Sequence, residues 1–159
     1  MRNSTDPTDL SWMRAALRAA REAGRAGEIP VGVVIVDRQG QRVASGSNRT
    51  LRDSDPTAHA EIVALRRAAR RIGNHRLTGL SVYCTLEPCP MCVGALVQAR
   101  VKRLIYGADD EKGGGISHGH HKSSAFNHRF KFSRGLLESE SACLLREFFA
   151  SRRASAQKT

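Results

Sequence analysis

Two cysteines in the stretch TLEPCPMCVG, residues 85–94, have the spacing of a metal-binding or redox pair. Cys89 and Cys92 are three residues apart, and Pro90 can open a helix after Cys89 because its missing N–H costs nothing in the first turn. Residues three apart share one face of a helix, so both sulfurs can point to one site beyond the helix N-terminus, where the positive end of the helix favours thiolate. Taken alone, the pair fits a zinc site and a redox site equally.

A histidine and a glutamate in PTAHAEI, residues 56–62, favour the metal site. His59 and Glu61 stand at the predicted start of another helix, after a strand and a loop, so His59 can be a third ligand. Catalytic zinc takes three protein ligands and keeps one position for water, whereas structural zinc takes four. The other cysteines, Cys84 in a predicted strand and Cys143 in a distant helix, are expected to be small core residues.

This set of groups suits the hydrolytic removal of an amine from a nucleobase. Zinc lowers the pKa of a bound water from about 15.7 to about 7, which makes hydroxide available at neutral pH. Glu61 is then the general acid–base that takes the proton of the water and delivers it to a ring nitrogen and to the leaving amine. Together, the motifs H-x-E and P-C-x-x-C form the signature of zinc nucleobase deaminases.

The elements that must position these groups alternate along the chain. Apolar residues at helical spacing after Asp9, the expected N-cap, predict a first helix that ends near Gly24 and Gly27. Strands are predicted over 29–37, 42–48, 80–85 and 101–108, and helices over 58–73, 90–100 and 136–153. In the helix at 58–73, the residues expected to face the core are Ile62, Leu65 and Ala69. In the helix at 136–153, the residues expected to face inward are Leu137, Cys143, Leu144, Phe148 and Phe149. The strand–helix–strand order favours parallel pairing with helices on the sheet faces.

The composition of residues 109–126, rich in glycine, histidine and serine, predicts a long loop. Loops of this length are often functional. Its histidines, His118, His120 and His121, are expected to be solvated rather than to bind metal.

Composition sets the outer bounds. The 159 residues suit a single domain over 1–159, ordered from about 9 to 153 with flexible tails at 1–8 and 154–159. No run of eighteen apolar residues exists, and the N-terminus lacks the pattern of a signal peptide, so a cytoplasmic location is expected. The formal net charge of +11 favours a nucleic-acid partner, although an arginine-rich genome explains such a charge equally well.

These motifs resemble the cytidine-deaminase-like superfamily, and most of all its bacterial tRNA-specific adenosine deaminases, which convert the wobble adenosine of a tRNA anticodon to inosine. The resemblance covers about residues 10–153. It rests on EIPVGVVIV, DPTAHAEI, TLEPCPMCVGALVQARVKRLIYGA, NHR at 127–129 and EFFASRR. It implies an α/β fold with three α/β/α layers and a central mixed, largely parallel five-stranded sheet. It also implies one Zn²⁺ per subunit, a homodimer and the tRNA anticodon loop as partner.

The resemblance also implies residue roles. His59, Cys89 and Cys92 match the zinc ligands, and Glu61 matches the proton shuttle. The residues that match substrate contacts are Asn48, which hydrogen-bonds the target base, Glu28, Pro30 and Val31 of the pocket floor, and Asp110 near the anticodon loop. The residues that match RNA contacts are Asn127, His128, Arg129, Phe148, Phe149, Arg152 and Arg153. On the residues alone, Asn48 also suits a simple turn, and the two phenylalanines suit core packing equally well.

Residues 112–126 depart from the family pattern, because they are richer in glycine, more polar and shorter than its usual segment. This region borders the substrate, so a free nucleobase or nucleoside, such as guanine or cytosine, stays open as an alternative substrate. A non-enzymatic RNA-binding module that uses zinc for folding is the other alternative, and it requires a fourth ligand.

Overall fold

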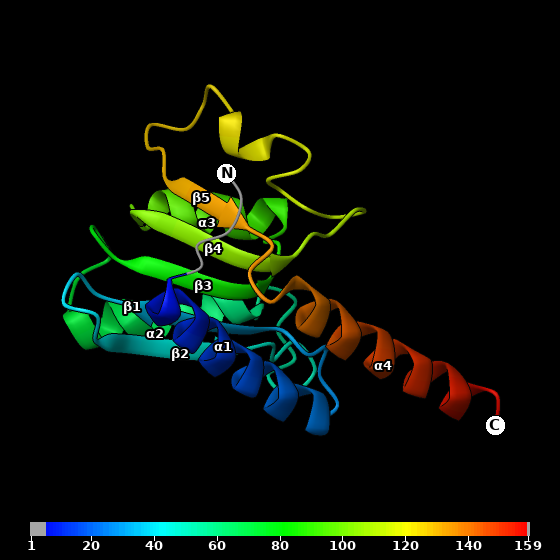
Figure 1. The fold of residues 1–159 in the computed structure, drawn as a ribbon. Helices are drawn as coiled ribbons and strands as arrows, with labels where there is room; N and C mark the ends of the chain where they lie inside the picture. Colours follow the sequence, from blue (N-terminus) through cyan, green and yellow to red (C-terminus); the bar gives the residue numbers. More distant parts are fainter. Residues whose placement is uncertain (1–5, 159) are drawn as a thin grey trace.

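A computed structural model describes residues 6–158, which form one five-stranded mixed sheet with helices on both faces (Figure 1). The elements are α1 (Pro7–Arg25), β1 (Gly32–Val36), β2 (Arg42–Ser47), α2 (Ala60–Ile72), β3 (Ser81–Leu86), α3 (Pro90–Gln98), β4 (Arg103–Ala108), the 3₁₀ turn η1 (His120–Lys122), β5 (Lys131–Arg134) and α4 (Glu138–Ala156). The strand order is β2-β1-β3-β4-β5, with β1 antiparallel to both neighbours and with β3, β4 and β5 parallel. The expected mixed sheet is confirmed, and so is the parallel pairing across β3-α3-β4.

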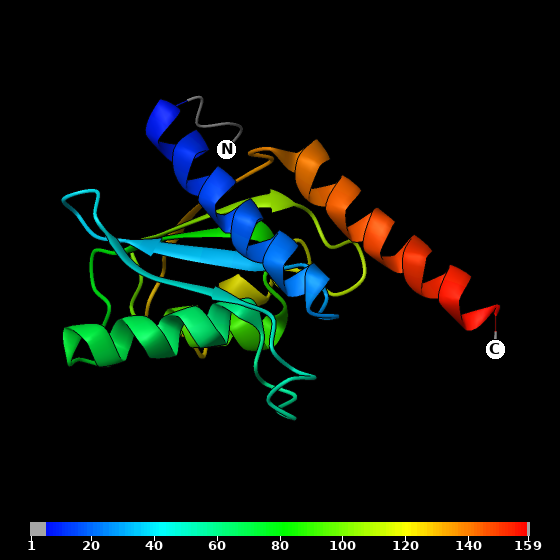
Figure 2. The same cartoon turned by 90° about the horizontal axis from the view of Figure 1, so that it is seen from below.

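The sheet separates two helical layers. In Figure 2, α1 and α4 lie on one side of the strands, and α2 and α3 lie on the other. Strand β1 is buried on both faces, which explains its continuous apolar sequence. Val33 and Ile35 belong to the core cluster under α2 and α3, whereas Val34 and Val36 belong to the cluster under α1.

Two glycines let the helices approach the sheet closely. A Cβ atom at Gly46 of β2 would lie 2.7 Å from the carbonyl oxygen of Ala60 and 2.7 Å from the amide nitrogen of Ala64. The first turns of α2 therefore pack directly on β2, and this contact positions the start of that helix. On the other face, a Cβ atom at Gly32 would overlap the carbonyl oxygen of Ala16 in α1.

The outer edge of the sheet at β2 is covered by two arginines of α2. Arg67 donates to the carbonyl oxygen of Ser45 at 3.0 Å, and Arg71 donates to that of Val43 at 3.0 Å. Gly73 ends α2 in the left-handed conformation with φ of 73°, as a helix-terminating glycine does.

The start of α1 differs from the expectation. Asp6, rather than Asp9, is the N-cap, and its carboxylate accepts a hydrogen bond from the Thr8 amide at 2.8 Å. Asp9 is buried instead, where it accepts a hydrogen bond from the Tyr83 hydroxyl at 2.6 Å and pairs with Arg103. The helix ends at Arg25, between the two glycines that were predicted to stop it.

The faces of α2 and α4 also differ from the expectation. In α2, the core face consists of Ala60, Ala64 and Ala68 together with the predicted Leu65, because small residues allow the close contact with β2. The predicted Ala69 is half-buried but packs against the core cluster, whereas the predicted Ile62 is half-buried and lines, with Ala69, a groove toward α3.

In α4, Ser141 is the one fully buried side chain among the described residues. The helix projects from the body of the molecule (Figure 1). The predicted inward residues are therefore at most half-buried, and Phe149 is 42% exposed.

Helical structure extends further at both ends than the sequence indicated. Pro7 and Thr8 belong to α1, and Ala154 to Ala156 belong to α4. The rest of the expected tails lies partly outside the described residues, at 1–5 and 159. Within residues 6–158, no helix is both long enough and apolar enough to cross a membrane.

Candidate active site

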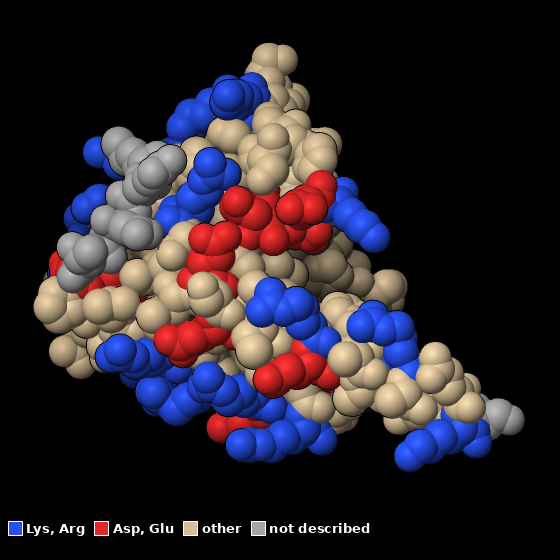
Figure 3. All heavy atoms as spheres, turned by 45° about the vertical axis from the view of Figure 1, so that its right-hand side comes forward, with Lys and Arg blue, Asp and Glu red and all other residues tan. Residues whose placement is uncertain are grey.

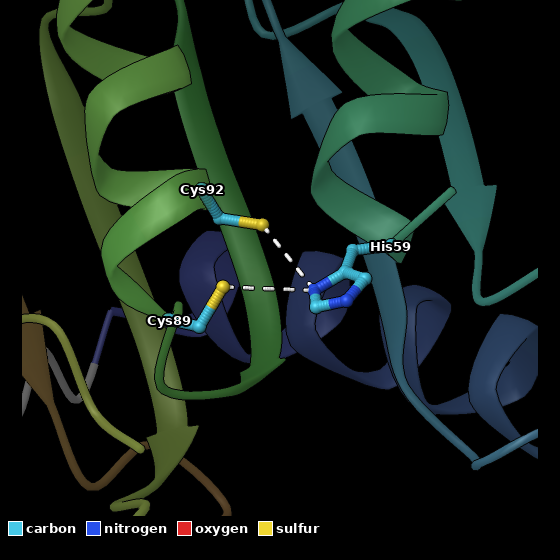
Figure 4. Close-up of side chains that lie close together, drawn as sticks. All are labelled: His59, Cys89 and Cys92. Carbon is cyan, nitrogen blue, oxygen red and sulfur yellow. Dashed lines mark hydrogen bonds between the residues drawn. The ribbon is translucent and has the colours of Figure 1, made fainter. Parts of the chain in front are cut away.

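The predicted ligand residues lie together where two helices begin. His59 is the N-cap of α2, Cys89 is the N-cap of α3, and Cys92 lies in the first turn of α3. Their ligand atoms all lie within 4.8 Å of one another, and each sulfur lies 3.6 Å from His59 Nδ1. Figure 4 shows both sulfurs directed from α3 toward the imidazole.

The donor set fits a zinc ion. Zinc–sulfur bonds of about 2.3 Å and zinc–nitrogen bonds of about 2.0–2.1 Å at a tetrahedral angle separate sulfur from nitrogen by about 3.6 Å. That is the separation of each cysteine sulfur from His59 Nδ1. All four cysteines lie in the described part of the chain and are free. No fourth His, Cys, Asp or Glu joins the group among residues 6–158.

The cysteine environment favours one thiolate. A hydrogen bond from the Cys92 thiol lowers the pKa of Cys89 to about 5, and the same shared proton raises the pKa of Cys92. Cys84 is fully buried, and burial raises its pKa. The structure thus places Cys84 in the core as predicted, whereas Cys143 is half-buried on α4 with its thiol donating to Glu147.

Glu61 lies in the first turn of α2, two residues after His59, and is 4% exposed. Burial raises the pKa of its carboxyl above the ordinary value of 4.5. The Cys84 thiol donates to Glu61 Oε1 at 3.6 Å, so the carboxyl has a neighbour on its buried side. A buried carboxyl with a raised pKa beside a metal-binding group is the arrangement expected of a general acid–base.

A cavity of about 190 Å³ opens above these groups. It is lined by Ile29, Val31, Asn48, Thr50, His59, Glu61, Leu86, Glu87, Cys89 and Asp110. The predicted substrate residues Val31, Asn48 and Asp110 are therefore at the site, and it is Asp110, not Asp109, that faces the cavity.

The predicted Glu28 and Pro30 take different positions. Glu28 is fully buried and accepts hydrogen bonds from the backbone amides of Leu51 at 3.0 Å and Arg52 at 2.8 Å. It also accepts from Asn48 Nδ2 at 3.3 Å, so it supports the lining from behind rather than forming the floor. Pro30 lies in a hollow between α1 and α4.

The C-terminal residues predicted to contact RNA lie next to this cavity. Phe148, Phe149 and Arg152 line a second hollow of about 300 Å³. That hollow shares Ile29 and Thr50 with the first cavity. The guanidinium of Arg152 stacks over the Phe148 ring at 5.0 Å from its centroid, and Arg153 is exposed on the same helix.

The residues at 127–129 lie at the other end of α3. The side chain of Arg100, just beyond that helix, donates to the carbonyl oxygen of Asn127 at 3.1 Å, and His128 Nε2 lies 2.8 Å from the carbonyl oxygen of Val101. Arg129 donates to the carbonyl oxygens of residues 121–123. Since α3 has nine residues, these groups lie about 14 Å or more from Cys89 along the helix.

Sequence reasoning missed the part played by Glu87 in the lining. Glu87 is 2% exposed and accepts hydrogen bonds from the loop after β4. The sequence signal that could have indicated this role is an acidic residue directly before Pro88 and Cys89, together with the run of three glycines at 113–115. The three loop histidines gather no metal-binding group: His120 is exposed, His121 packs edge-on against Phe132, and His118 Nδ1 lies 2.8 Å from the Gly114 carbonyl oxygen.

Comparison with known proteins agrees with this geometry. Residues 6–108 match the family described as the cytidine and deoxycytidylate deaminase zinc-binding region. The chain is similar to the tRNA-specific adenosine deaminase of Haemophilus influenzae, with 45% identity over 147 residues, 91% of this chain and 85% of that protein. The enzyme of the same name from Agrobacterium fabrum is 44% identical over 151 residues, 89% of this chain and 94% of that protein.

Solved structures of deaminases are also similar to this chain. A tRNA:A34 deaminase superposes with a TM-score of 0.83 at 43% identity, over 85% of this chain and 99% of that one. The guanine deaminase from Nitrosomonas europaea gives a TM-score of 0.78 at 26% identity, over 89% of this chain and 84% of that one. The chain therefore belongs to the zinc-binding cytidine and deoxycytidylate deaminase family, and within it to the group of tRNA-specific adenosine deaminases.

Proposed function

We propose that this protein is a zinc-dependent hydrolytic deaminase that converts adenosine to inosine at the wobble position of a tRNA anticodon. The observation that carries the proposal is the buried Glu61 carboxyl, which lines one cavity together with His59 and Cys89. The names of the relatives that match most of the chain support the substrate, as does the tRNA:A34 deaminase among the solved structures.

The residues divide the chemistry among them. One zinc ion per subunit, held by His59 Nδ1 and the sulfurs of Cys89 and Cys92, would supply a water whose pKa is about 7. Glu61 moves the protons: its carboxyl accepts one from the attacking water and donates it to ring N1, and a second transfer protonates the leaving amine. The water oxygen becomes the carbonyl oxygen at C6, and the exocyclic nitrogen leaves as ammonia.

Asn48 orients the base. Its Nδ2 donates to the buried Glu28, so the Oδ1 atom is the one available to accept a hydrogen bond from the substrate. Val31 supplies an apolar wall, and Asp110 stands at the cavity lining on the side of the loop after β4. A base must leave its stack to enter such a cavity, as in other enzymes that act on nucleobases.

The RNA surrounding the base is proposed to lie across α4 and the basic groups of the same face. Phe148 and Phe149 offer aromatic surface for stacking, and Arg152 and Arg153 offer positive charge for phosphates. Figure 3 shows groups of Lys and Arg side chains at the top, along the lower edge and beside the end of α4, with acidic side chains gathered between them. Residues 127–129 lie too far from the cavity to touch the reacting base, so in this proposal they meet a more distant part of the RNA.

We also infer a cytoplasmic homodimer. An apolar groove of about 350 Å³ between α2 and α3 offers a surface for a second copy, and it includes Ile62, Leu65 and Ala69. Ile72 and Met91 on the same two helices are 46% and 39% exposed. Light scattering coupled to gel filtration tests this point, and Ala69→Arg is the variant expected to give monomers.

The test of the function is incubation of the zinc-loaded protein with tRNA transcripts, free adenosine and free guanine. We expect inosine at the wobble position of a tRNA that carries adenosine there, with kcat/KM falling steeply between 50 and about 200 mM salt. Guanine is included because the guanine deaminase neighbour shares the fold. Release of ammonia from guanine, with tRNA left unchanged, would replace this proposal with deamination of a free base.

A further inference from the structure

The loop that follows β4 is folded around one buried carboxylate. Glu87 Oε1 accepts hydrogen bonds from the Ile116 amide at 3.0 Å and the Ser117 amide at 2.6 Å. Glu87 Oε2 accepts from the Asp110 amide at 2.8 Å and from the Ser117 hydroxyl at 2.9 Å. Four donors from one loop thus converge on a side chain that is 2% exposed, which makes Glu87 the organising group of residues 110–117.

Two glycines of this loop allow its close approach to Glu87 and to the neighbouring turn. A Cβ atom at Gly114 would overlap the Glu87 carboxylate, and one at Gly115 would lie 2.6 Å from Val93 Cγ2. The Gly115 amide also donates to the carbonyl oxygen of Pro88 at 2.7 Å. Gly114 and Gly115 therefore let the loop backbone lie directly against the turn between β3 and α3.

This contact joins two parts of the cavity wall. Glu87 and Asp110 both line the cavity, and Cys89 follows Glu87 by two residues on the same turn. The Asp110 backbone is bonded to Glu87, while Asp110 Oδ1 accepts from the Lys112 amide at 3.1 Å and the Gly113 amide at 3.0 Å. A shift of this loop would therefore move Asp110 relative to the metal-binding turn without displacing Glu61, which belongs to α2.

We propose that Glu87 is a positioning residue that holds the loop 110–117 in place and thereby fixes Asp110 in the substrate-facing lining of the cavity. It acts on how the nucleotide is held, through the loop, and does not take part in proton transfer. The inference rests on the proposed function for its substrate. It gives a role to the glycines of this loop.

Glu87→Gln is the sharpest variant, because it keeps the size of the side chain. An amide has one acceptor atom, so its NH₂ group must face either the Asp110 amide or the Ile116 and Ser117 amides. Glu111→Gln is the matched control, since Glu111 lies in the same loop with its side chain exposed. We expect Glu87→Gln to raise KM for tRNA about tenfold or more, with kcat within about threefold of wild type, whereas Glu111→Gln has little effect.

Two further measurements separate positioning from general damage. Hydrogen exchange of the amides at 110–117 should become faster in Glu87→Gln, while zinc content and exchange in α2 stay at wild-type values. Gly114→Ala keeps the carboxylate but pushes the loop away from it, so it should reproduce both the KM increase and the faster exchange. This second variant decides the matter if Glu87→Gln fails to fold.

Three results would overturn the proposal: unchanged KM and exchange in Glu87→Gln, a fall in kcat with KM unchanged, or a Gly114→Ala variant that behaves as wild type. If wild-type protein fails to deaminate tRNA, the proposed function is lost, but the exchange measurements still report whether Glu87 holds the loop.

Discussion

Replacing Glu61 with glutamine tests the chemistry at its centre. Glutamine has nearly the size of glutamate and leaves His59, Cys89 and Cys92 in place, but it cannot carry a proton between water and base. General acid–base catalysis contributes about 10²–10⁴-fold, which is a barrier of about 3–5 kcal/mol. We therefore expect kcat for tRNA deamination to fall by at least about a hundredfold, while zinc content stays at the wild-type level.

The same substitution has a predicted effect on stability. In the zinc-free protein, burial raises the pKa of the Glu61 carboxyl above its ordinary value of 4.5. The folded state therefore holds the proton more tightly than the unfolded state. The stabilising contribution of protonated Glu61 is complete below the unfolded pKa and is lost as pH rises through the folded pKa. Glu61→Gln lacks this dependence. The thermal midpoint of the variant minus that of wild type should therefore increase as pH rises above about 4.5.

The assay combines mass spectrometry of inosine in tRNA with metal analysis and thermal unfolding of the chelated protein at several pH values. Glu61→Asp serves as a control that keeps the carboxyl group but shortens the side chain by one methylene. The reasoning is refuted if Glu61→Gln keeps more than about a tenth of wild-type kcat, because Glu61 would then not be the proton carrier. Loss of zinc in this variant would show instead that Glu61 supports the metal site.

Three other predictions concern the site and its support. A hydrogen bond from the Cys92 thiol lowers the pKa of Cys89 to about 5, so in chelated protein the rate at which iodoacetamide labels Cys89 should rise as pH passes through about 5. Buried Cys84 should stay unlabelled, because its pKa is raised. Peptide mass spectrometry measures the labelling of both cysteines. Asn48→Ala should raise KM for tRNA about tenfold or more with zinc retained, and steady-state kinetics with an unchanged KM would contradict its contact with the base. Gly46→Ala should lower the free energy of unfolding by about 1–3 kcal/mol through overlap with α2, whereas Gly94→Ala in the open part of α3 should not lower it; urea titration compares the two.

The pairing of Cys89 with Cys92 was predictable because it is local, whereas His59, thirty residues earlier in the chain, was assigned from the combination of H-x-E with P-C-x-x-C. Each residue stands at a helix start, and a spacing of three within α3 directs both sulfurs to one point. The zinc-binding pattern therefore carries its own structural context. The same holds for β1, whose continuous apolar sequence matches burial on both faces.

The part played by Glu87 was not readable in the same way. It depends on hydrogen bonds between segments more than twenty residues apart, made by backbone amides that have no signature in a sequence. The sequence predicted a long glycine-rich loop at 109–126 but assigned its glycines no role, whereas in the structure two of them serve close packing.

The exposure of α4 was missed for a related reason. Apolar residues at helical spacing indicate a face that can be buried, but they do not tell whether another part of the chain covers it. In the described residues, Phe149 stays 42% exposed, and Arg152 of that helix bonds to the carbonyl oxygen of Gly27.

The arginine cover on the outer strand β2 has a consequence for behaviour at high concentration. A bare outer strand is a template onto which a neighbouring molecule can add its own strand, and repeated addition leads to fibres. Here the carbonyl oxygens of residues 43 and 45 are already occupied by guanidinium groups. Growth of the sheet from this side must first break those bonds, so the chain carries its own protection against strand-by-strand aggregation.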